Sequence, residues 1–419
     1  MLKLSVKGKR RLVGEVKVSG SKNAALPILA AAIMLPGHSL IKNVPNLLDV
    51  TTMLRVLRAL GIRAEYSLEN PNRVDIWNEQ VRHVAPYELV TKMRASFFVI
   101  GPVLAVKGLA KIPLPGGCAI GSRPVNLHIK GMEALGAKVE LEHGFVIARA
   151  AKLRGGRVYL DFPSVGATEA VMMAATQAAG ETVIENAARE PEIVDLANFL
   201  IKAGAKIEGA GSEKVLIQGG TRLRPIEYKI IPDRIEAGTL MIAAAITHGS
   251  LKITGIVGEH LEATASKLSE SGVEISLHDD YLTAKTDDGF QAVEVKTLPH
   301  PGFPTDMQPQ FSALLTLARG TSVVTETVFE NRFMHVHELR RMGADIKIEG
   351  QSAIIKGVPK LSGAPVKVSD LRAGAALLLA GLAAEGETFI EDRDSHINRG
   401  YENIIDKLNS VGAEIKLGG

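Results

Sequence analysis

The sequence of 419 residues predicts an α/β protein of two domains, each built from three repeats in which a buried helix is surrounded by sheets and outer helices. Three observations lead to this fold class. A helix-ending glycine recurs at nearly constant spacing, and a small-residue apolar helix recurs between these glycines. Hydrophobic residues make up 46% of the chain and aromatic residues only 4%, so Ala, Val, Ile and Leu must form the core. The length is sufficient for two domains.

The first repeated pattern is a helix end, a glycine and a short strand, as in LRALGIRAEY and MEALGAKVEL. Each glycine is expected to adopt the left-handed conformation that ends a helix, and the alternating residues after it predict a strand. Neighbouring copies lie 68 to 75 residues apart, which six unrelated segments would not maintain. The six glycines are Gly61, Gly136, Gly204, Gly272, Gly343 and Gly412.

The second pattern is a polar start followed by a helix that is apolar on nearly all sides, which predicts a buried helix. Pro27 predicts that the first of these helices becomes regular near it, leaving Lys22 and Asn23 in the preceding turn. Other segments, such as 189–204, are amphipathic and predict helices that face solvent. The break between the two sets of three repeats is expected near 222–234. The apolar helices with their following strands span 20–41, 93–112, 164–184, 233–253, 305–324 and 371–390.

Composition excludes several classes of function. The 49 basic and 46 acidic residues give a net charge of +3, which does not predict a nucleic-acid partner. The first residues are charged with no apolar stretch after them, and the longest apolar runs fall short of the roughly 18 residues of a membrane span, so neither a signal peptide nor a membrane partner is expected. A single cysteine fits a cytoplasmic protein with no internal disulfide. No metal-ligand spacing or nucleotide-binding loop is found, so no metal and no cofactor is expected.

Cations lie at the starts of the predicted buried helices, where the positive end of the helix dipole opposes them unless an anion offsets their charge. Asp233, Thr305 and Asp370 lie at the same places and can be ordinary N-caps. The cations predict a cleft between the domains that binds a ligand bearing phosphate and carboxylate, because Arg binds both groups bidentately. They are Lys22, Arg94, Arg234 and Arg372, with loop residues Arg123, Arg332 and Arg399.

The only cysteine, Cys118, lies in the glycine-rich segment LPGGCAIGSRP. Arg123 and Lys130 nearby are expected to stabilise its thiolate form and make it reactive. The glycines around it are expected to let this loop close as a lid would. From the residues alone, an inert surface thiol is an equally good interpretation.

Long segments of the chain resemble one known family. SGSKNAALP, LPGGCAIGSRPVNLHI, PSVGATE, ENAAREPEIVDLANFL, PDRIEAGT, FPTDMQPQF and VFENRFMHVHEL closely resemble the UDP-N-acetylglucosamine 1-carboxyvinyltransferases, enolpyruvyl transferases of the EPSP synthase superfamily. The likeness covers about residues 14–415. The related enolpyruvylshikimate-phosphate synthases share the six repeats but lack the cysteine-bearing loop with its GSRPVNLHI continuation. The resemblance implies two inside-out α/β barrel domains, one of residues 22–230 and one of residues 1–21 and 231–419.

The resemblance also implies an activity and its residues. The implied reaction is transfer of the enolpyruvyl group of phosphoenolpyruvate to the 3-hydroxyl of UDP-N-acetylglucosamine with release of phosphate, the first committed step of peptidoglycan biosynthesis. The implied catalytic residues are Lys22, Arg399, Cys118 as the proton donor that fosfomycin alkylates, and Asp306 as base for, or orienter of, the sugar hydroxyl. The resemblance and the charged helix starts predict these substrate-binding residues: Lys22, Asn23, Arg94, Arg123, Pro124, Val125, Asn126, Leu127, Ser164, Val165, Gly166, Thr305, Asp306, Val328, Phe329, Arg332, Asp370, Arg372 and Arg399.

Three positions depart from the family pattern. Asn126 and Asn398 stand where many members have Asp, and Phe162 stands where some have Lys. Asn keeps the shape of Asp but removes its charge, so at position 126 contact with the uridine part is expected to change. Phe162 removes one cation from the predicted diphosphate contacts.

Two other classes of protein are weighed against the transferase. A catalytically silent UDP-sugar-binding regulatory paralogue would not need all four implied catalytic residues, yet the chain retains them. An RNA-processing protein with similar repeats would need exposed basic faces, which the near-neutral charge disfavours.

Overall fold

The computed structural model describes residues 2–116, 121, 124–287 and 289–418. They form two compact units. The N-terminal unit comprises residues 20–116 and 124–231, and the C-terminal unit comprises residues 2–19, 121, 232–287 and 289–418. Each unit has its own hydrophobic core. None of the helices in the described segments is long and apolar enough to cross a membrane.

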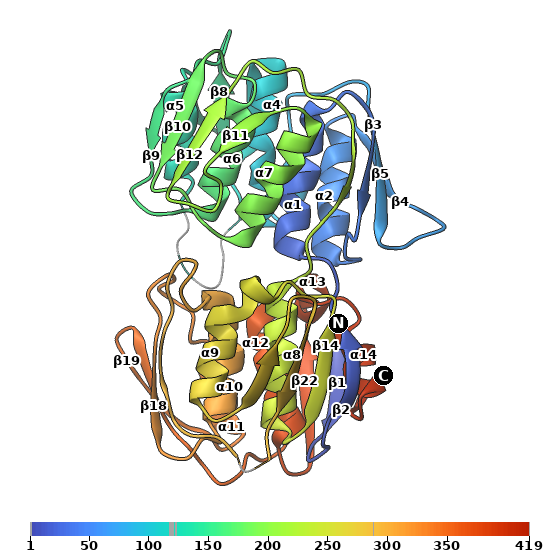
Figure 1. Ribbon diagram of the computed structural model, residues 1–419, viewed down its shortest axis with the longest axis vertical. Helices are drawn as coiled ribbons and strands as arrows, with labels where there is room; N and C mark the ends of the chain where they lie inside the picture. Colours follow the sequence, from blue (N-terminus) through green and yellow to red (C-terminus); the bar gives the residue numbers. More distant parts are fainter. Residues whose placement is uncertain (1, 117–120, 122–123, 288, 419) are drawn as a thin grey trace. The chain divides into compact units, whose positions relative to one another are not determined.

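The N-terminal unit contains three sheets with helices between them (Figure 1). The sheets have the strand orders β13-β3-β5-β4, β6-β8-β7 and β11-β12-β10-β9. Their strands are β3 (Gly37–Lys42), β4 (Arg63–Tyr66), β5 (Arg73–Asn78), β6 (Leu109–Pro113), β7 (Lys138–Glu142), β8 (Phe145–Arg149), β9 (Arg157–Tyr159), β10 (Glu181–Glu185), β11 (Lys206–Glu208), β12 (Lys214–Gln218) and β13 (Glu227–Lys229). The helices are α1 (Lys22–Ala31), η1 (Ala32–Met34), α2 (Leu48–Ala59), α3 (Tyr87–Val90), η2 (Arg94–Val99), α4 (Ile100–Lys107), α5 (Asn126–Ala134), α6 (Val165–Ala175) and α7 (Pro191–Ala203).

The C-terminal unit repeats this plan with the sheets β15-β16-β14-β2, β17-β18-β20-β19 and β21-β22-β1-β23. Its strands are β1 (Leu2–Lys7), β2 (Val13–Lys17), β14 (Ser250–Thr254), β15 (Glu274–Leu277), β16 (Tyr281–Lys285), β17 (Glu294–Lys296), β18 (Thr321–Thr325), β19 (Asp345–Glu349), β20 (Ser352–Lys356), β21 (Pro365–Lys367), β22 (Glu387–Asp392) and β23 (Glu414–Leu417). The helices are α8 (Arg234–Ile246), η3 (Gly258–Leu261), α9 (Glu262–Glu270), η4 (Thr305–Met307), α10 (Gln308–Leu315), α11 (His335–Arg341), α12 (Leu371–Ala383), α13 (His396–Gly400) and α14 (Ile404–Ser410).

The prediction of six repeats is confirmed by the backbone of the described segments. All six helix-ending glycines have a positive φ, between 85° and 117°, a conformation that only glycine adopts readily. Five sheets combine antiparallel strands with one parallel edge strand, as in the pairing of β2 with β14. In the sixth sheet, the parallel partner is reduced to a single bridge between Val84 and Lys111.

The apolar helices predicted from the sequence form the interior of each unit. In the N-terminal unit these are α1, η2 with α4, and α6, and in the C-terminal unit they are α8, α10 and α12. Nearly every side chain of α8 and α12 is buried. The predicted fold class, with buried helices surrounded by sheets and outer helices, is therefore confirmed.

The predicted start of the first buried helix is wrong. Helix α1 begins at Lys22, and Pro27 lies inside it. The Ser21 hydroxyl accepts a hydrogen bond from the Ala24 amide at 3.3 Å and so caps the helix before the proline is reached. Pro27 then removes only the one amide that would bond to the Asn23 carbonyl.

Helix α7 is more buried than its amphipathic pattern predicts. The side chains of Asn198, Ile201 and Lys202 are exposed, while most of the helix is buried. Its Asp195 carboxylate accepts a hydrogen bond from the Tyr228 hydroxyl at 2.6 Å, so a residue of β13 covers part of the polar face. The sequence pattern predicts that Asp195 faces solvent, whereas in the structure Tyr228 contacts it.

Candidate active site

In the N-terminal unit, the candidate site begins with a buried ion pair at the start of α1. Lys22 is 6% exposed, and its Nζ lies 3.3 Å from Oδ2 of Asp49, in the first turn of α2. The Asp49 carboxylate therefore offsets part of the charge that Lys22 places at a helix N-terminus. Asp49 was not among the residues predicted from the sequence. A single acidic residue in the first turn of an amphipathic helix is common and does not by itself indicate a functional site.

Three predicted segments of this unit meet at the starts of η2, α5 and α6. Nη2 of Arg94 lies 3.4 Å from the Pro124 carbonyl oxygen, just before α5. A Cβ placed on Gly166 would come within 3.0 Å of His128 Nε2, which shows how closely α5 approaches α6 there. Ser164 caps α6 by accepting a hydrogen bond from the Ala167 amide at 3.3 Å. The structure thus brings Arg94, the segment 124–127 and the segment 164–166 together.

His128 joins these segments and has a shifted pKa. It is 5% exposed and packs edge-on against Phe97, with ring centroids 5.4 Å apart. Burial, and secondarily the charge of Arg94, lowers the pKa of His128 from 6.5 to about 3. The imidazole is therefore neutral at physiological pH.

We expect His128 to weaken the fold in acid. Below pH 6.5 the unfolded chain binds a proton that the native imidazole refuses, so stability falls as the pH drops toward 3, by about 1.4 kcal/mol per pH unit. Urea unfolding at pH 7 and pH 5 measures how far the free energy of unfolding falls between these two pH values. This fall should be about 2 kcal/mol smaller in His128→Leu than in the parent protein. His83→Gln, at an exposed histidine, is the matched control. Equal losses in the parent protein and His128→Leu would contradict this assignment.

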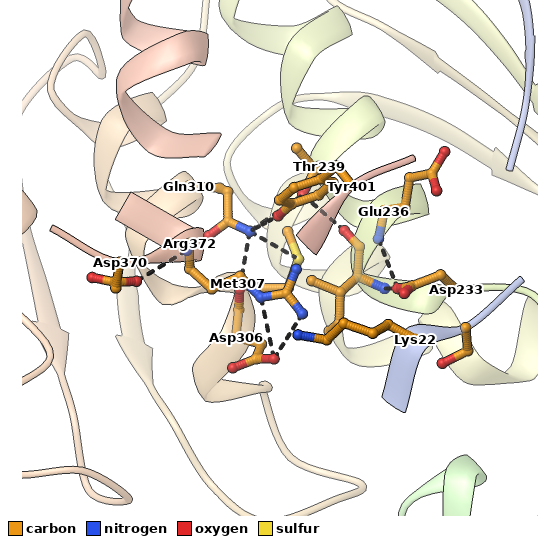
Figure 2. A network of polar contacts seen from close by, with 12 residues as sticks. Lys22, Asp233, Glu236, Thr239, Asp306, Met307, Gln310, Asp370, Arg372 and Tyr401 are labelled. Carbon is orange, nitrogen blue, oxygen red and sulfur yellow. Dashed lines mark hydrogen bonds and ion pairs between the residues drawn. The ribbon is translucent and has the colours of Figure 1, made fainter. Parts of the chain in front are cut away.

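In the C-terminal unit, the candidate site is built around the Asp306 carboxylate, which η4 presents at the start of α10 (Figure 2). Its Oδ1 accepts a hydrogen bond from Nη2 of Arg332 at 2.9 Å. Its Oδ2 accepts two from Arg372, from Nη2 at 2.9 Å and from Nε at 3.2 Å. The Asp306 side chain is 27% exposed, whereas those of Arg332 and Arg372 are 3% and 1% exposed. The carboxylate is therefore the accessible part of a buried charged cluster.

An aromatic ring lies against each of these two arginines. The Cζ atom of Arg332 lies 5.5 Å from the centroid of the Phe329 ring, and that of Arg372 lies 5.2 Å from the centroid of the Tyr401 ring. Cation–π attraction of this kind favours a guanidinium placed over a ring face. Arg332 and Arg372 thus hold both oxygens of Asp306, and the Asp233 carboxylate adds a second negative charge near Arg372.

Glu326 holds the segment that contains Val328 and Phe329. It is 1% exposed, and its Oε1 accepts hydrogen bonds from the Val328 amide at 2.8 Å and the Phe329 amide at 3.2 Å. Its Oε2 accepts one from the Thr305 hydroxyl at 2.9 Å. One buried carboxylate thus fixes three predicted site residues. Glu326 was missed in the sequence, where only its place directly after the β18 segment could have indicated it.

Two acids at helix starts prove to be caps. Asp233 accepts hydrogen bonds from the Ile235 and Glu236 amides and caps α8. Asp370 accepts hydrogen bonds from the first amides of α12. Thr305 does not cap a helix. The expectation that ligand charge must offset every cation at a helix start is too broad, because Asp306 and Asp49 offset Arg372 and Lys22.

Arg399 lies on α13, which packs against α12 and precedes Tyr401. The Asp392 carboxylate accepts hydrogen bonds from the His396 and Ile397 amides and anchors the start of this helix. Arg399 is thereby carried on the helix next to the one that carries Arg372.

Several other predicted residues either lie outside the described ranges or are exposed. Cys118 and Arg123 lie outside the described residues. The departures Asn126, Asn398 and Phe162 are all exposed side chains, the last at 42%. Among the described residues, no group of three or more His, Cys, Asp or Glu side chains could hold a metal ion.

Comparison with solved structures identifies the fold. The enolpyruvyl transferase NikO from Streptomyces tendae superposes with a TM-score of 0.88 at 26% identity, covering 100% of this chain and 99% of that one. EPSP synthase from Acinetobacter baumannii superposes with a TM-score of 0.76 over 100% of both chains, and its 17% identity supports likeness of fold alone. The fold and the charged helix starts define an enolpyruvyl transferase.

Comparison of sequences defines the family more closely. The family model for EPSP synthase (3-phosphoshikimate 1-carboxyvinyltransferase) matches residues 6–408. A protein of Caldanaerobacter subterraneus named UDP-N-acetylglucosamine 1-carboxyvinyltransferase 1 is 55% identical over 96% of both chains. Proteins of Carboxydothermus hydrogenoformans and Geobacter metallireducens, also named UDP-N-acetylglucosamine 1-carboxyvinyltransferase, are each 54% identical over 99% of both chains. The chain belongs to the EPSP synthase family, in its group of UDP-N-acetylglucosamine 1-carboxyvinyltransferases.

Proposed function

We propose that the protein transfers the enolpyruvyl group of phosphoenolpyruvate to the 3-hydroxyl of UDP-N-acetylglucosamine and releases phosphate, in the cytoplasm, as the first committed step of peptidoglycan biosynthesis. The observation that carries this proposal is the identity of 54–55% to relatives named for this transfer over almost their whole length. The retained residues Lys22, Arg94, Asp306 and Arg399 support it.

The reaction is an addition to the double bond of phosphoenolpyruvate followed by an elimination of phosphate. The sugar oxygen forms a bond to C2 of phosphoenolpyruvate while a proton is added to its methylene carbon, which gives a tetrahedral intermediate. The bond from C2 to the phosphate oxygen then breaks, and the methyl group loses a proton as the C2=C3 double bond of the enol ether forms. Catalysis therefore needs a proton donor, an acceptor for the hydroxyl proton and positive charge for the departing phosphate.

Each requirement has a residue suited to it. We assign Asp306 as the acceptor that binds the 3-hydroxyl, because its carboxylate is the exposed part of a buried cluster. The hydrogen bonds from two arginines hold both oxygens of this carboxylate in place. Asp306 therefore orients the hydroxyl as well as accepting its proton. Lys22, Asn23, Arg94, Arg123 and Arg399 supply positive charge and hydrogen bonds to phosphoenolpyruvate. Residues 123–127 and 164–166 bind the uridine diphosphate, and Val328 and Phe329 lie against the sugar.

Cys118 is proposed as the proton donor and as the target of fosfomycin-type alkylators. Because the chain has one cysteine, a thiol reagent reacts at a single known position. Complete alkylation is expected to lower turnover at least a hundredfold, measured as phosphate release alongside the mass of the modified chain. Cys118→Ser should gain no mass from the reagent. Full turnover by a completely alkylated protein would contradict the assignment.

The proposed function is tested by phosphate release. The purified protein is mixed with phosphoenolpyruvate and UDP-N-acetylglucosamine, and release is expected only with both present. Shikimate 3-phosphate in place of the sugar nucleotide is the matched acceptor control and should give none. Release with shikimate 3-phosphate alone, or no release with the sugar nucleotide, would overturn the proposal.

A further inference from the structure

Tyr401, which follows α13, is buried at 2% exposure and was not among the predicted site residues. Its ring lies against the guanidinium of Arg372, with Cζ 5.2 Å from the ring centroid. Nη1 of Arg372 is buried and has no hydrogen-bond partner among the described residues. The ring therefore lies against a guanidinium whose Nε and Nη2 donate hydrogen bonds to Asp306.

The hydroxyl of Tyr401 is fixed by two buried side chains (Figure 2). It lies 3.1 Å from Oγ1 of Thr239 and 3.0 Å from Nε2 of Gln310. The Thr239 hydroxyl donates its only proton to the Ile235 carbonyl at 2.8 Å. The phenol consequently donates to Thr239 and accepts from Gln310. Burial raises the pKa of Tyr401, so the phenol keeps the proton that this arrangement requires.

Gln310 connects this arrangement to Asp306. Its Nε2 also lies 2.9 Å from the main-chain oxygen of Asp306. One amide group therefore contacts both the tyrosine that supports Arg372 and the backbone of the carboxylate that Arg372 binds. The partners come from α8, α10 and the end of α13, so the position of Arg372 relative to Asp306 depends on three helices.

We propose that Tyr401 is a positioning residue that fixes the guanidinium plane of Arg372 against Asp306. The proposal rests on the proposed function, in which Asp306 acts on the acceptor hydroxyl. A misplaced carboxylate affects the reacting complex more than it affects initial binding of the sugar nucleotide. Loss of the ring should therefore lower kcat and leave KM for UDP-N-acetylglucosamine nearly unchanged.

The test compares ring loss at two buried positions of the same unit. Tyr401→Leu removes the ring from Arg372, and Tyr401→Phe removes only the hydroxyl. Phe311→Leu, in α10, removes a fully buried ring that packs against Phe303 instead of an arginine. We expect Tyr401→Leu to lower kcat at least tenfold with KM within threefold, Tyr401→Phe to give a smaller loss of kcat than Tyr401→Leu, and Phe311→Leu to keep kcat within threefold. Equal kcat in Tyr401→Leu and Phe311→Leu would overturn the proposal.

A second measurement does not depend on turnover. In a double-mutant cycle on urea unfolding, Tyr401→Leu and Arg372→Met should be non-additive by at least fivefold in the unfolding equilibrium constant. Additive effects would show that the ring does not support the guanidinium, whatever the enzyme catalyses. Tyr401→Met, which fills more of the same space, replaces the leucine variant in both experiments if that variant does not fold. Coupling without phosphate release by the parent protein would overturn the proposed function and leave the support of Arg372 standing.

Discussion

Asp306→Asn is expected to lower kcat by a hundredfold or more while KM for UDP-N-acetylglucosamine changes less than fivefold. The amide cannot accept the hydroxyl proton, and its NH₂ group faces one of the two arginines that now donate to the carboxylate. The side chain keeps nearly the same shape and volume, so the sugar nucleotide is still expected to bind. Steady-state phosphate release, with sugar-nucleotide binding measured by calorimetry, checks this result.

Asp345→Asn is the matched control for this change. Asp345 lies exposed on β19 of the same unit, so the same loss of a carboxylate there should leave kcat unaltered. Loss of sugar-nucleotide binding in Asp306→Asn would show that Asp306 only positions the substrate. An unchanged kcat would remove it from the reaction altogether.

Arg372→Met is expected to destabilise the C-terminal unit by about 2–4 kcal/mol, because it removes two charge-assisted hydrogen bonds from a buried site. The loss stays below that of an orphaned buried charge, because Arg332 still pairs with Asp306. Arg372→Lys keeps the charge but loses the planar fork and the contact with the Tyr401 ring. We therefore expect Arg372→Lys to recover part of the stability but to remain at least tenfold below the parent protein in kcat.

Urea unfolding and steady-state kinetics on both variants measure these effects. Arg393→Met is the matched control, since Arg393 is exposed and pairs with Glu391 at the surface. That variant should lose less than about 0.5 kcal/mol. A stability loss in Arg372→Met no larger than in Arg393→Met would show that the buried cluster does not stabilise the unit.

The repeats were predictable from the sequence because each depends on local signals. A glycine such as Gly204 must follow its helix directly, and an apolar run such as that of α12 has no solvent-facing side. The starts of the buried helices were found in the same way, and with them Asp306 and Arg372. The start of α1 was misplaced because Pro27 is a strong local signal that the Ser21 cap overrides.

The residues missed by sequence reasoning are single polar side chains whose partners are distant in the chain. Gln310 lies 71 residues from Thr239, and Tyr401 lies 162 residues from Thr239. No periodicity pairs positions so far apart. A signal was nevertheless present, because Gln310 and Thr239 are polar residues in helices that are almost entirely buried, and a buried polar group requires a partner.

The pairing of β1 and β2 has a consequence for biosynthesis. These strands come from the first 17 residues of the chain, yet β1 lies between β22 and β23, and β2 pairs with β14. On a ribosome that adds about 5–20 residues per second, β1 waits roughly 20–80 s for its last partner to be synthesised. During that interval β1 must remain unpaired while the intervening unit folds behind it, whereas β2 gains its partner β14 once residue 254 has been added. Chaperone contact with a nascent chain stalled near residue 300 should therefore concentrate on β1.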